Sequence, residues 1–284
     1  MSIKRVGIVG SGIMGSGIAE TAAVAGFDVV LRSRAQKTAD AMVAGMAKSL
    51  GRQVEKQKID SAEADAALSR VNAVSDLAEL AGCDLVIESV VEELAVKKHL
   101  FSELDRICGE ATILATNTST LPVVEMAMET GRPEKVCGVH FFNPAPVMSL
   151  VEIVRPITAS EETVDAVRGF AETCGKSPVV VKDQAGFIVN ALLFPYLNNA
   201  VRLLEQQVAS RDDIDTAMKG GCGFPMGPFA LLDLVGLDTS LAILDALYDE
   251  YRDPNYAAVP LLRRMVSAEL LGRKSGRGFY DYRK

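Results

Sequence analysis

The chain of 284 residues is long enough for two domains, and 49% of it is apolar, so it can bury a sizeable core. Its formal net charge of −7 argues against a nucleic acid or an anionic membrane surface as a partner. Any bound phosphate must therefore be held by a few placed basic groups and by backbone amides.

Cysteine usage indicates a reducing compartment and argues against a metal site. The cysteines are odd in number, scattered and never spaced as CxxC: Cys83, Cys108, Cys137, Cys174 and Cys222. This pattern favours free thiols over a disulfide framework or a zinc site. The N-terminal apolar run breaks at Gly10, too early for a signal peptide, and no stretch is apolar enough to span a bilayer. We expect a soluble, cytoplasmic protein that binds no metal.

The first half of the chain alternates strand and helix patterns. Short β-branched runs predict strands at residues 5–10, 28–32, 84–90, 112–118, 135–142, 149–154 and 178–183. Helical patterns cover residues 16–26, about 35–67, 94–108 and 161–175. Near-continuous apolar strands separated by helices predict an α/β fold with a parallel, doubly wound, Rossmann-like sheet.

Beyond residue 187 the sequence predicts helices only. Their patterns cover residues 188–207, 211–221, 227–236, 237–251 and 260–272. We therefore place a Rossmann-like dinucleotide-binding domain over residues 1–183 and a helical domain over residues 187–284. The helix of residues 188–204 is apolar on more faces than a single buried stripe requires, so we expect this domain to form a homodimer.

A glycine-rich loop directly follows the first strand and opens the first helix. It reads Gly10-Ser11-Gly12-Ile13-Met14-Gly15. Glycines there permit a tight turn and the close approach of a pyrophosphate, which the free amides at the helix start can bind. The loop therefore predicts a dinucleotide site. The second strand ends "VVLRSR", without the carboxylate that such sites use to hold the ribose.

The segments "TNTST" and "HFFNP" end neighbouring strands, so their side chains should face one crevice. There Ser119 and His140 could bind one substrate oxygen, while Glu152 binds the far imidazole nitrogen and fixes the tautomer. Alternatively, His140 only packs and Glu152 pairs with a lysine. A Ser–His–Glu hydrolase triad is a weaker alternative, because Ser119 lies outside a GxSxG elbow. His99, in a predicted helix, is interpreted as structural or solvent-exposed.

Six segments together resemble the short-chain L-3-hydroxyacyl-CoA dehydrogenase family, especially its bacterial 3-hydroxybutyryl-CoA dehydrogenases. They are "GSGIMGSGIA", "NTST", "HFFNPAPVMSLVEIV", "GFIVNALLFPYLNNA", "PMGPFALLDLVGLD" and "GRKSGRGFYDY", and the resemblance covers nearly the whole chain. It implies a Rossmann-like N-terminal domain and a helical, dimerising C-terminal domain. It also implies the reversible oxidation of an (S)-3-hydroxyacyl-CoA to the 3-ketoacyl-CoA with NAD or NADP.

Carried over residue by residue, the resemblance makes His140 the general base and Glu152 its orienting acid. It makes Ser119 the residue that binds the 3-oxygen of the substrate, with Asn190 completing the site from the second domain. The coenzyme contacts that it implies outside the glycine loop are Glu92, Lys97, Ser119, Asn143 and Lys274. Ser49 and Lys56 match contacts to coenzyme A, although the alignment is loose in that helical stretch.

The end of the second strand departs from relatives that use NAD, which generally carry an aspartate there. Its position falls on Ser33, and Arg34 follows. Serine removes a charge that repels a 2′-phosphate, and arginine can supply a charge-assisted contact to that phosphate. This favours NADP(H) over NAD(H). The opposing interpretation treats Arg32 and Arg34 as solvated loop charges, but it does not account for the missing carboxylate.

Two rival functions are compatible with part of this pattern. One is the oxidation of a sugar acid by an enzyme of the same fold, but the basic residues in 48–58 favour coenzyme A. The other is a non-catalytic, crystallin-like nucleotide-binding protein. The presence of Ser119, His140, Glu152 and Asn190 together favours an enzyme, since a binding protein does not need all four.

Overall fold

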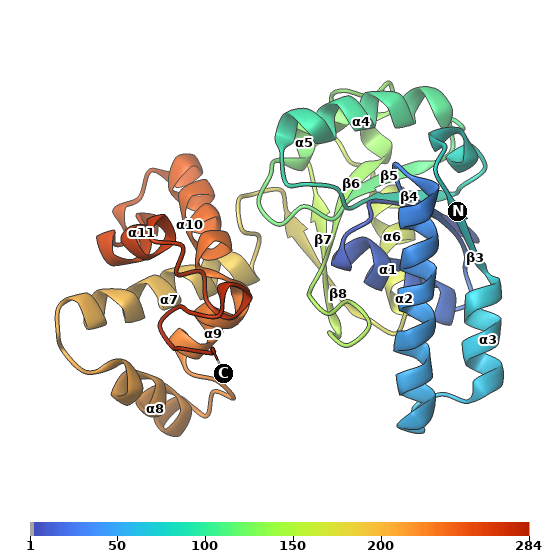
Figure 1. Cartoon of the computed structure of the whole chain (residues 1–284). Helices are drawn as coiled ribbons and strands as arrows, with labels where there is room; N and C mark the ends of the chain where they lie inside the picture. Colours follow the sequence, from blue (N-terminus) through green and yellow to red (C-terminus); the bar gives the residue numbers. More distant parts are fainter. Residues whose placement is uncertain (1–2, 284) are drawn as a thin grey trace. The chain divides into compact units, whose positions relative to one another are not determined.

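The computed structural model describes residues 3–283, and the chain divides into two compact units between Asp183 and Gln184 (Figure 1). Each unit has its own hydrophobic core. The five cysteines are free thiols. Within the described residues, no helix combines the length and the apolar character needed to cross a membrane.

The first unit is built on one sheet, to which the described residues contribute eight strands in the order β3-β2-β1-β4-β5-β6-β7-β8. The strands are β1 (Arg5–Val9), β2 (Asp28–Arg32), β3 (Val71–Val74), β4 (Leu85–Glu88), β5 (Ile113–Thr116), β6 (Val136–Phe141), β7 (Leu150–Arg155) and β8 (Ser177–Lys182). All neighbouring pairs are parallel except β6 and β7. The predicted Rossmann-like class is confirmed.

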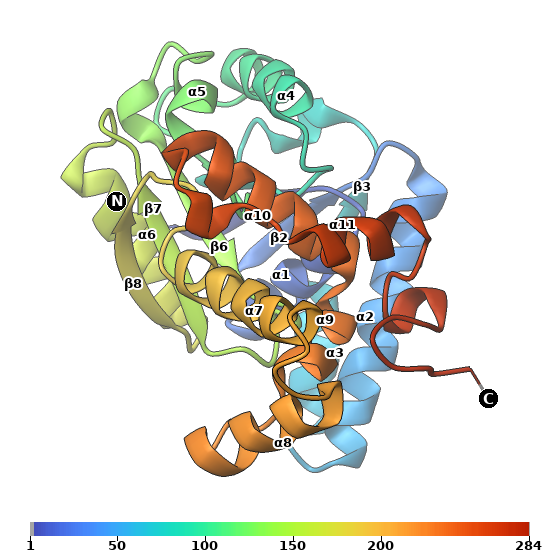
Figure 2. The same cartoon turned by 90° about the vertical axis from the view of Figure 1, so that its left-hand side faces the viewer.

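Helices cover both faces of this sheet (Figures 1 and 2). One face carries α1 (Ile13–Val24), α2 (Gln36–Glu55), α3 (Ser61–Ser69) and α6 (Glu161–Thr173). The other face carries α4 (Leu94–Ile107), α5 (Val123–Ala127) and the 3-10 turns η1 (Leu77–Leu80) and η2 (Pro133–Lys135). Because helices cover both faces, the central strands β4 and β5 are buried along their whole length, which explains their continuous apolar runs.

Two strands differ from the prediction. The sequence pattern does not predict β3, whose four residues are mostly part-exposed and pair only with β2 at the sheet edge. β7 runs antiparallel to β6, where a parallel strand was expected. Only residues 142–149 connect the two, and a parallel pairing needs a crossover of roughly a dozen residues or more.

The second unit is helical in its described residues, as predicted. Its elements are α7 (Val189–Glu205), α8 (Arg211–Cys222), α9 (Pro228–Val235), α10 (Leu237–Tyr251), α11 (Pro260–Ser267) and the 3-10 turns η3 (Pro254–Tyr256) and η4 (Arg273–Ser275). α7 packs against α9, α10 and α11 and buries Phe194 and Leu197 in the core. Leu192, on another face of α7, is 72% exposed.

Candidate active site

The loop between β1 and α1 has the backbone that a dinucleotide site requires. Gly10 has a φ of +136°, and a Cβ at this position would collide with the carbonyl of Ser89. A Cβ on Gly15 would collide with the carbonyl oxygen of Gly10, so glycine is needed for α1 to start this close to β1. Gly12 faces open space and caps α1 without a side-chain hydrogen bond, which leaves the first helical amides for a phosphate.

A cavity of about 590 Å³ lies next to this loop, a size typical of ligand sites. Its wall is formed by the glycine loop, the end of β2, the segment after β4, the first three turns of α4 and one residue of η1. The lining residues are Gly10, Ser11, Gly12, Arg32, Ser33, Arg34, Leu77, Ser89, Val90, Val91, Val96, His99, Leu100 and Glu103. The loop and this cavity together fit a dinucleotide. His99 is exposed, as expected, although it borders the cavity.

The end of β2 presents a hydroxyl and a guanidinium to this cavity. Ser33 is 3% exposed and Arg34 is exposed. Arg32 is engaged elsewhere, because its Nε donates to the Ser75 carbonyl at 3.2 Å. Among the described residues of the wall, Glu103 of α4 is the one carboxylate. The strand end therefore lacks an acid in the structure as well as in the motif.

The antiparallel pair β6–β7 brings His140 and Glu152 face to face. The two residues are register partners, and 2.8 Å separates His140 Nδ1 from Glu152 Oε2. Both are buried, with 6% and 1% exposed. The ring of Phe142 packs against the imidazole, with 4.5 Å between ring centroids. This contact between a buried carboxylate and Nδ1 fixes the orientation of the imidazole ring.

Ser119 lies at the same edge of the sheet as His140. It belongs to the loop after β5, and the amide of Phe141 donates to Asn117 Oδ1 of that loop at 2.8 Å. Because β5 and β6 are parallel neighbours, their carboxyl ends open together. Ser119 is half-buried, and its amide donates to Glu92 Oε1 at 2.8 Å.

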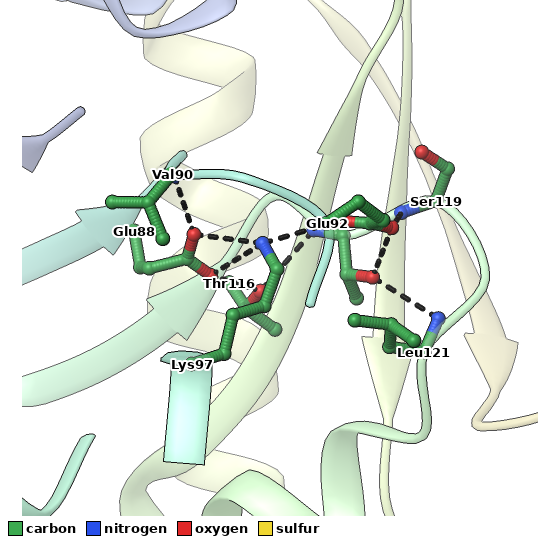
Figure 3. A network of polar contacts seen from close by, with 8 residues as sticks. Glu88, Val90, Glu92, Lys97, Thr116, Ser119 and Leu121 are labelled. Carbon is green, nitrogen blue, oxygen red and sulfur yellow. Dashed lines mark hydrogen bonds and ion pairs between the residues drawn. The ribbon is translucent and has the colours of Figure 1, made fainter. Parts of the chain in front are cut away.

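Glu92 and Lys97, both expected to contact the coenzyme, form an ion pair with 3.1 Å between Glu92 Oε2 and Lys97 Nζ (Figure 3). Burial alone would raise the pKa of Glu92. Lys97 and the hydrogen bonds from Thr118 and Ser119 outweigh that effect and hold the pKa below its usual value. Asn143 is exposed in the connection between β6 and β7.

Two further predicted site residues belong to the second unit. Asn190 is 7% exposed in the first turn of α7. Lys274, in η4, donates from Nζ to Asp238 Oδ2 at 2.6 Å. All the other expected site residues belong to the first unit.

A second groove, of about 480 Å³, is lined by residues of α1 and α2, by Ser11 and Gly12 of the glycine loop and by residues 144–146. Ser49 lines it and donates to Glu20 Oε1 at 2.9 Å, while Gln53 Nε2 donates to the same oxygen at 2.8 Å. Glu20 is 4% exposed, and burial raises its pKa even though both hydrogen bonds act to lower it. Lys56 is exposed at the C-terminal cap of α2, outside the residues that line this groove.

Among the described residues of the first unit, two buried carboxylates were not predicted from the sequence. Glu88 ends β4 and is 0% exposed. The sequence contains a pattern that could have indicated this burial, because Glu88 ends the apolar run "LVIE" much as Glu152 lies inside "LVEIV". Glu20 carried no comparable signal, since the helix pattern around it contains small residues on every side and does not show which side is buried.

Two family models match this chain. The model described as the NAD binding domain of 3-hydroxyacyl-CoA dehydrogenase matches residues 5–184. The model described as the C-terminal domain of 3-hydroxyacyl-CoA dehydrogenase matches residues 186–282. The two matches together cover nearly the whole chain, and the first indicates a nicotinamide dinucleotide as cofactor.

Individual proteins are similar over the same length. The chain is 47% identical to a 3-hydroxybutyryl-CoA dehydrogenase of Clostridioides difficile over 280 residues, which is 99% of this chain and 100% of that protein. It is 42% identical to the mitochondrial hydroxyacyl-coenzyme A dehydrogenase of Sus scrofa, covering 99% of this chain and 92% of that one. The crystal structure of an (S)-3-hydroxybutyryl-CoA dehydrogenase from Ralstonia eutropha matches with a TM-score of 0.97, 43% identity and complete coverage of both chains. The chain therefore belongs to the 3-hydroxyacyl-CoA dehydrogenase family of oxidoreductases.

Proposed function

We propose that the protein catalyses the reversible oxidation of (S)-3-hydroxybutyryl-CoA, or another short (S)-3-hydroxyacyl-CoA, to the 3-ketoacyl-CoA. The observation that carries this proposal is the buried contact between His140 Nδ1 and Glu152 Oε2 at the carboxyl edge of a dinucleotide-binding sheet. Relatives named 3-hydroxybutyryl-CoA dehydrogenase, with 43–47% identity over the full length, support the choice of substrate.

In the oxidation, His140 removes the proton of the 3-hydroxyl group. With Nδ1 engaged by Glu152, Nε2 is the nitrogen that takes this proton. The carboxylate of Glu152 then stabilises the imidazolium that forms. In the reverse direction the imidazolium returns the proton to the 3-keto oxygen. The hydride acceptor in the oxidation, and the hydride donor in the reduction, is the nicotinamide coenzyme when it is bound.

Ser119 and Asn190 hold the 3-oxygen in this proposal. A hydroxyl and an amide donor directed at that oxygen would stabilise the negative charge that develops on it and align C3 for hydride transfer. Ser119 is supported by its place at the same edge of the sheet as His140. Asn190 is supported by its burial in the first turn of α7 and by the family motif around it.

For the coenzyme we propose NADP(H) in preference to NAD(H). Ser33 and Arg34 line the cavity at the end of β2, where a hydroxyl and a guanidinium favour a 2′-phosphate over a bare ribose. We further propose that Glu92, Lys97, Asn143 and Lys274 contribute to the coenzyme site.

For coenzyme A we propose the groove lined by α1 and α2. Its walls combine apolar Met42 and Met46 with the hydroxyl of Ser49, which suits a chain that carries amide groups. Lys56, exposed at the end of α2, is the proposed partner of a phosphate.

We also propose a homodimer formed through the second unit, because Leu192 leaves an apolar surface on α7.

The decisive experiment follows the absorbance of NADPH or NADH when acetoacetyl-CoA is added to the purified protein. The proposal predicts oxidation of the reduced coenzyme and formation of the (S)-3-hydroxybutyryl product. The absence of turnover with either coenzyme would overturn it, and so would a clear preference for a sugar acid over the acyl-CoA.

A further inference from the structure

Glu88 is fully buried, and the mechanism above gives it no role. It ends β4, where it is the register partner of Thr116 on β5. Its carboxylate accepts hydrogen bonds from Thr116 Oγ1 and from the Val90 amide, each at 2.6 Å. A buried carboxylate also needs a compensating charge.

Lys97 brings this charge from the first turn of α4 (Figure 3). Its Nζ lies 2.7 and 2.9 Å from the two carboxylate oxygens of Glu88 and 3.1 Å from Glu92 Oε2. An ammonium has three N–H donors, so these contacts engage all of them. The Lys97 side chain is 1% exposed, and it joins a fully buried carboxylate to one that is 38% exposed.

The other oxygen of Glu92 holds the loop after β5. Glu92 Oε1 accepts from Thr118 Oγ1 at 2.6 Å and from the Ser119 amide at 2.8 Å. Thr118 Oγ1 accepts from the Leu121 amide at 3.1 Å, and the Thr118 amide donates to Thr116 Oγ1 at 3.2 Å. The backbone amides of Thr118, Ser119 and Leu121 thus all donate hydrogen bonds to side chains of one network. The Ser119 side chain points away from this network in Figure 3.

We propose that Glu88 is a positioning residue: through Lys97 it fixes Glu92, and Glu92 fixes the loop that presents Ser119. The inference rests on the proposed function, in which Ser119 holds the 3-oxygen of the substrate. Glu92 is partly exposed and would exchange its loop contacts for water if Lys97 did not hold it. Lys97 thereby links β4 to the loop, a role additional to its proposed place in the coenzyme site.

The first test measures the loop itself by amide hydrogen exchange in Glu88→Gln. The amide keeps the shape of the side chain but places N–H hydrogens against the ammonium of Lys97. We expect peptides that cover residues 117–122 to exchange about tenfold faster or more, because their three amides lose the anchored network. Exchange that matches the wild type in these peptides overturns the proposal.

The second test measures steady-state kinetics with acetoacetyl-CoA. Glu88→Gln should lower kcat about tenfold or more, because a misplaced oxygen ligand acts on the transition state. The KM for the coenzyme should rise by a smaller factor than kcat falls: Glu92 and Lys97 belong to the proposed coenzyme site, but the variant keeps an oxygen that can accept from the Val90 amide in the cavity wall. Faster loop exchange with an unchanged kcat overturns the proposal. A rise in the KM of the coenzyme with no fall in kcat also overturns it.

A pair of variants separates positioning from general stability. Lys97→Met leaves Glu88 buried and unpaired, so its Tm should fall steeply. Glu88→Gln/Lys97→Met removes the charges together and should recover most of that Tm. The kcat of the double variant should stay about tenfold or more below the wild type, because nothing then holds Glu92. Recovery of kcat together with Tm would show that the network acts through stability alone.

Asp105→Asn is the matched control. Asp105 lies on the same helix α4 as Lys97 and forms a comparable ion pair with Arg132, with 2.7 Å between Oδ1 and Nε. This variant should lower Tm and leave both kcat and the exchange of residues 117–122 unchanged.

If the wild type does not reduce acetoacetyl-CoA, the proposed function fails. The exchange experiment still decides whether Glu88 fixes the loop.

Discussion

His140 and Glu152 oppose each other directly across the antiparallel strands β6 and β7, with 2.8 Å between Nδ1 and Oε2. A slip of one residue in this register would turn one of the two side chains to the opposite face of the sheet. The pairing therefore depends on the short connection of residues 142–149, which makes β7 return antiparallel beside β6.

Glu152→Gln should retain the ring contact and lose the negative charge that stabilises the imidazolium. We expect kcat for acetoacetyl-CoA reduction to fall about a hundredfold or more, with the Kd of the coenzyme little changed. Glu161→Gln is the control, because Glu161 pairs with Arg155 at the far end of β7 and is exposed. A Glu152→Gln enzyme as active as this control would contradict an orienting acid.

The coenzyme preference is tested by the ratio of kcat/KM for NADPH to kcat/KM for NADH. The wild type should prefer NADPH, and Ser33→Asp/Arg34→Ile should move the ratio toward NADH, because a carboxylate repels the 2′-phosphate and accepts from the ribose hydroxyls. Lys37→Ile removes a nearby positive charge outside the lining of the cavity and should leave the ratio unchanged. A wild-type preference for NADH would contradict the proposal.

Glu20 should make the stability of the protein depend on pH. Its folded pKa is raised above the ordinary value of 4.5, so the folded state holds the proton more tightly than the unfolded chain does. The contribution of Glu20 to stability is therefore present below pH 4.5 and is lost as the pH rises through the raised pKa. Glu20→Gln should raise Tm relative to the wild type at neutral pH, and the difference should shrink toward pH 4.5.

Melting curves of both proteins across this pH range check the prediction. Glu55→Gln, an exposed glutamate at the end of α2, serves as the control and should show no such trend. A Glu20→Gln difference that grew toward acid pH would reverse the sign of the argument.

The proposed dimer is tested by light scattering at micromolar concentration. The wild type should have twice the mass of one chain. Leu192→Glu should shift it toward the monomer, because Leu192 is 72% exposed on α7 and a charge there opposes apolar burial. Ile157→Glu alters an even more exposed apolar residue, at 94%, but in the first unit, and should leave the mass unchanged. A stable wild-type monomer would contradict the proposal.

Much of the fold could be predicted because local patterns decide it. The buried strands β1, β4 and β5 show as continuous apolar runs, and the glycine loop marks the start of α1. β3 could not be predicted, because its four residues are largely part-exposed and do not form an apolar run. The direction of β7 depends on the length of the loop before it, a signal that the strand pattern itself does not contain.

The same distinction applies to the site. Glu152 could be predicted because a charge inside an apolar strand requires a partner, and His140 lay on the neighbouring strand. The connection from Glu88 to the Ser119 loop could not be predicted, because Lys97 lies nine residues further along the chain, on a helix. The contact between Glu20 and Ser49 depends on how α1 packs against α2, which neither helix pattern specifies.

The most direct test of the central claim is the turnover number of His140→Gln in the reduction of acetoacetyl-CoA, measured beside the Kd of the coenzyme. If His140 is the general acid–base group, kcat should fall by about 10²–10⁴-fold while the Kd of the coenzyme stays near that of the wild type. A His140→Gln enzyme that kept near-normal turnover would contradict the account.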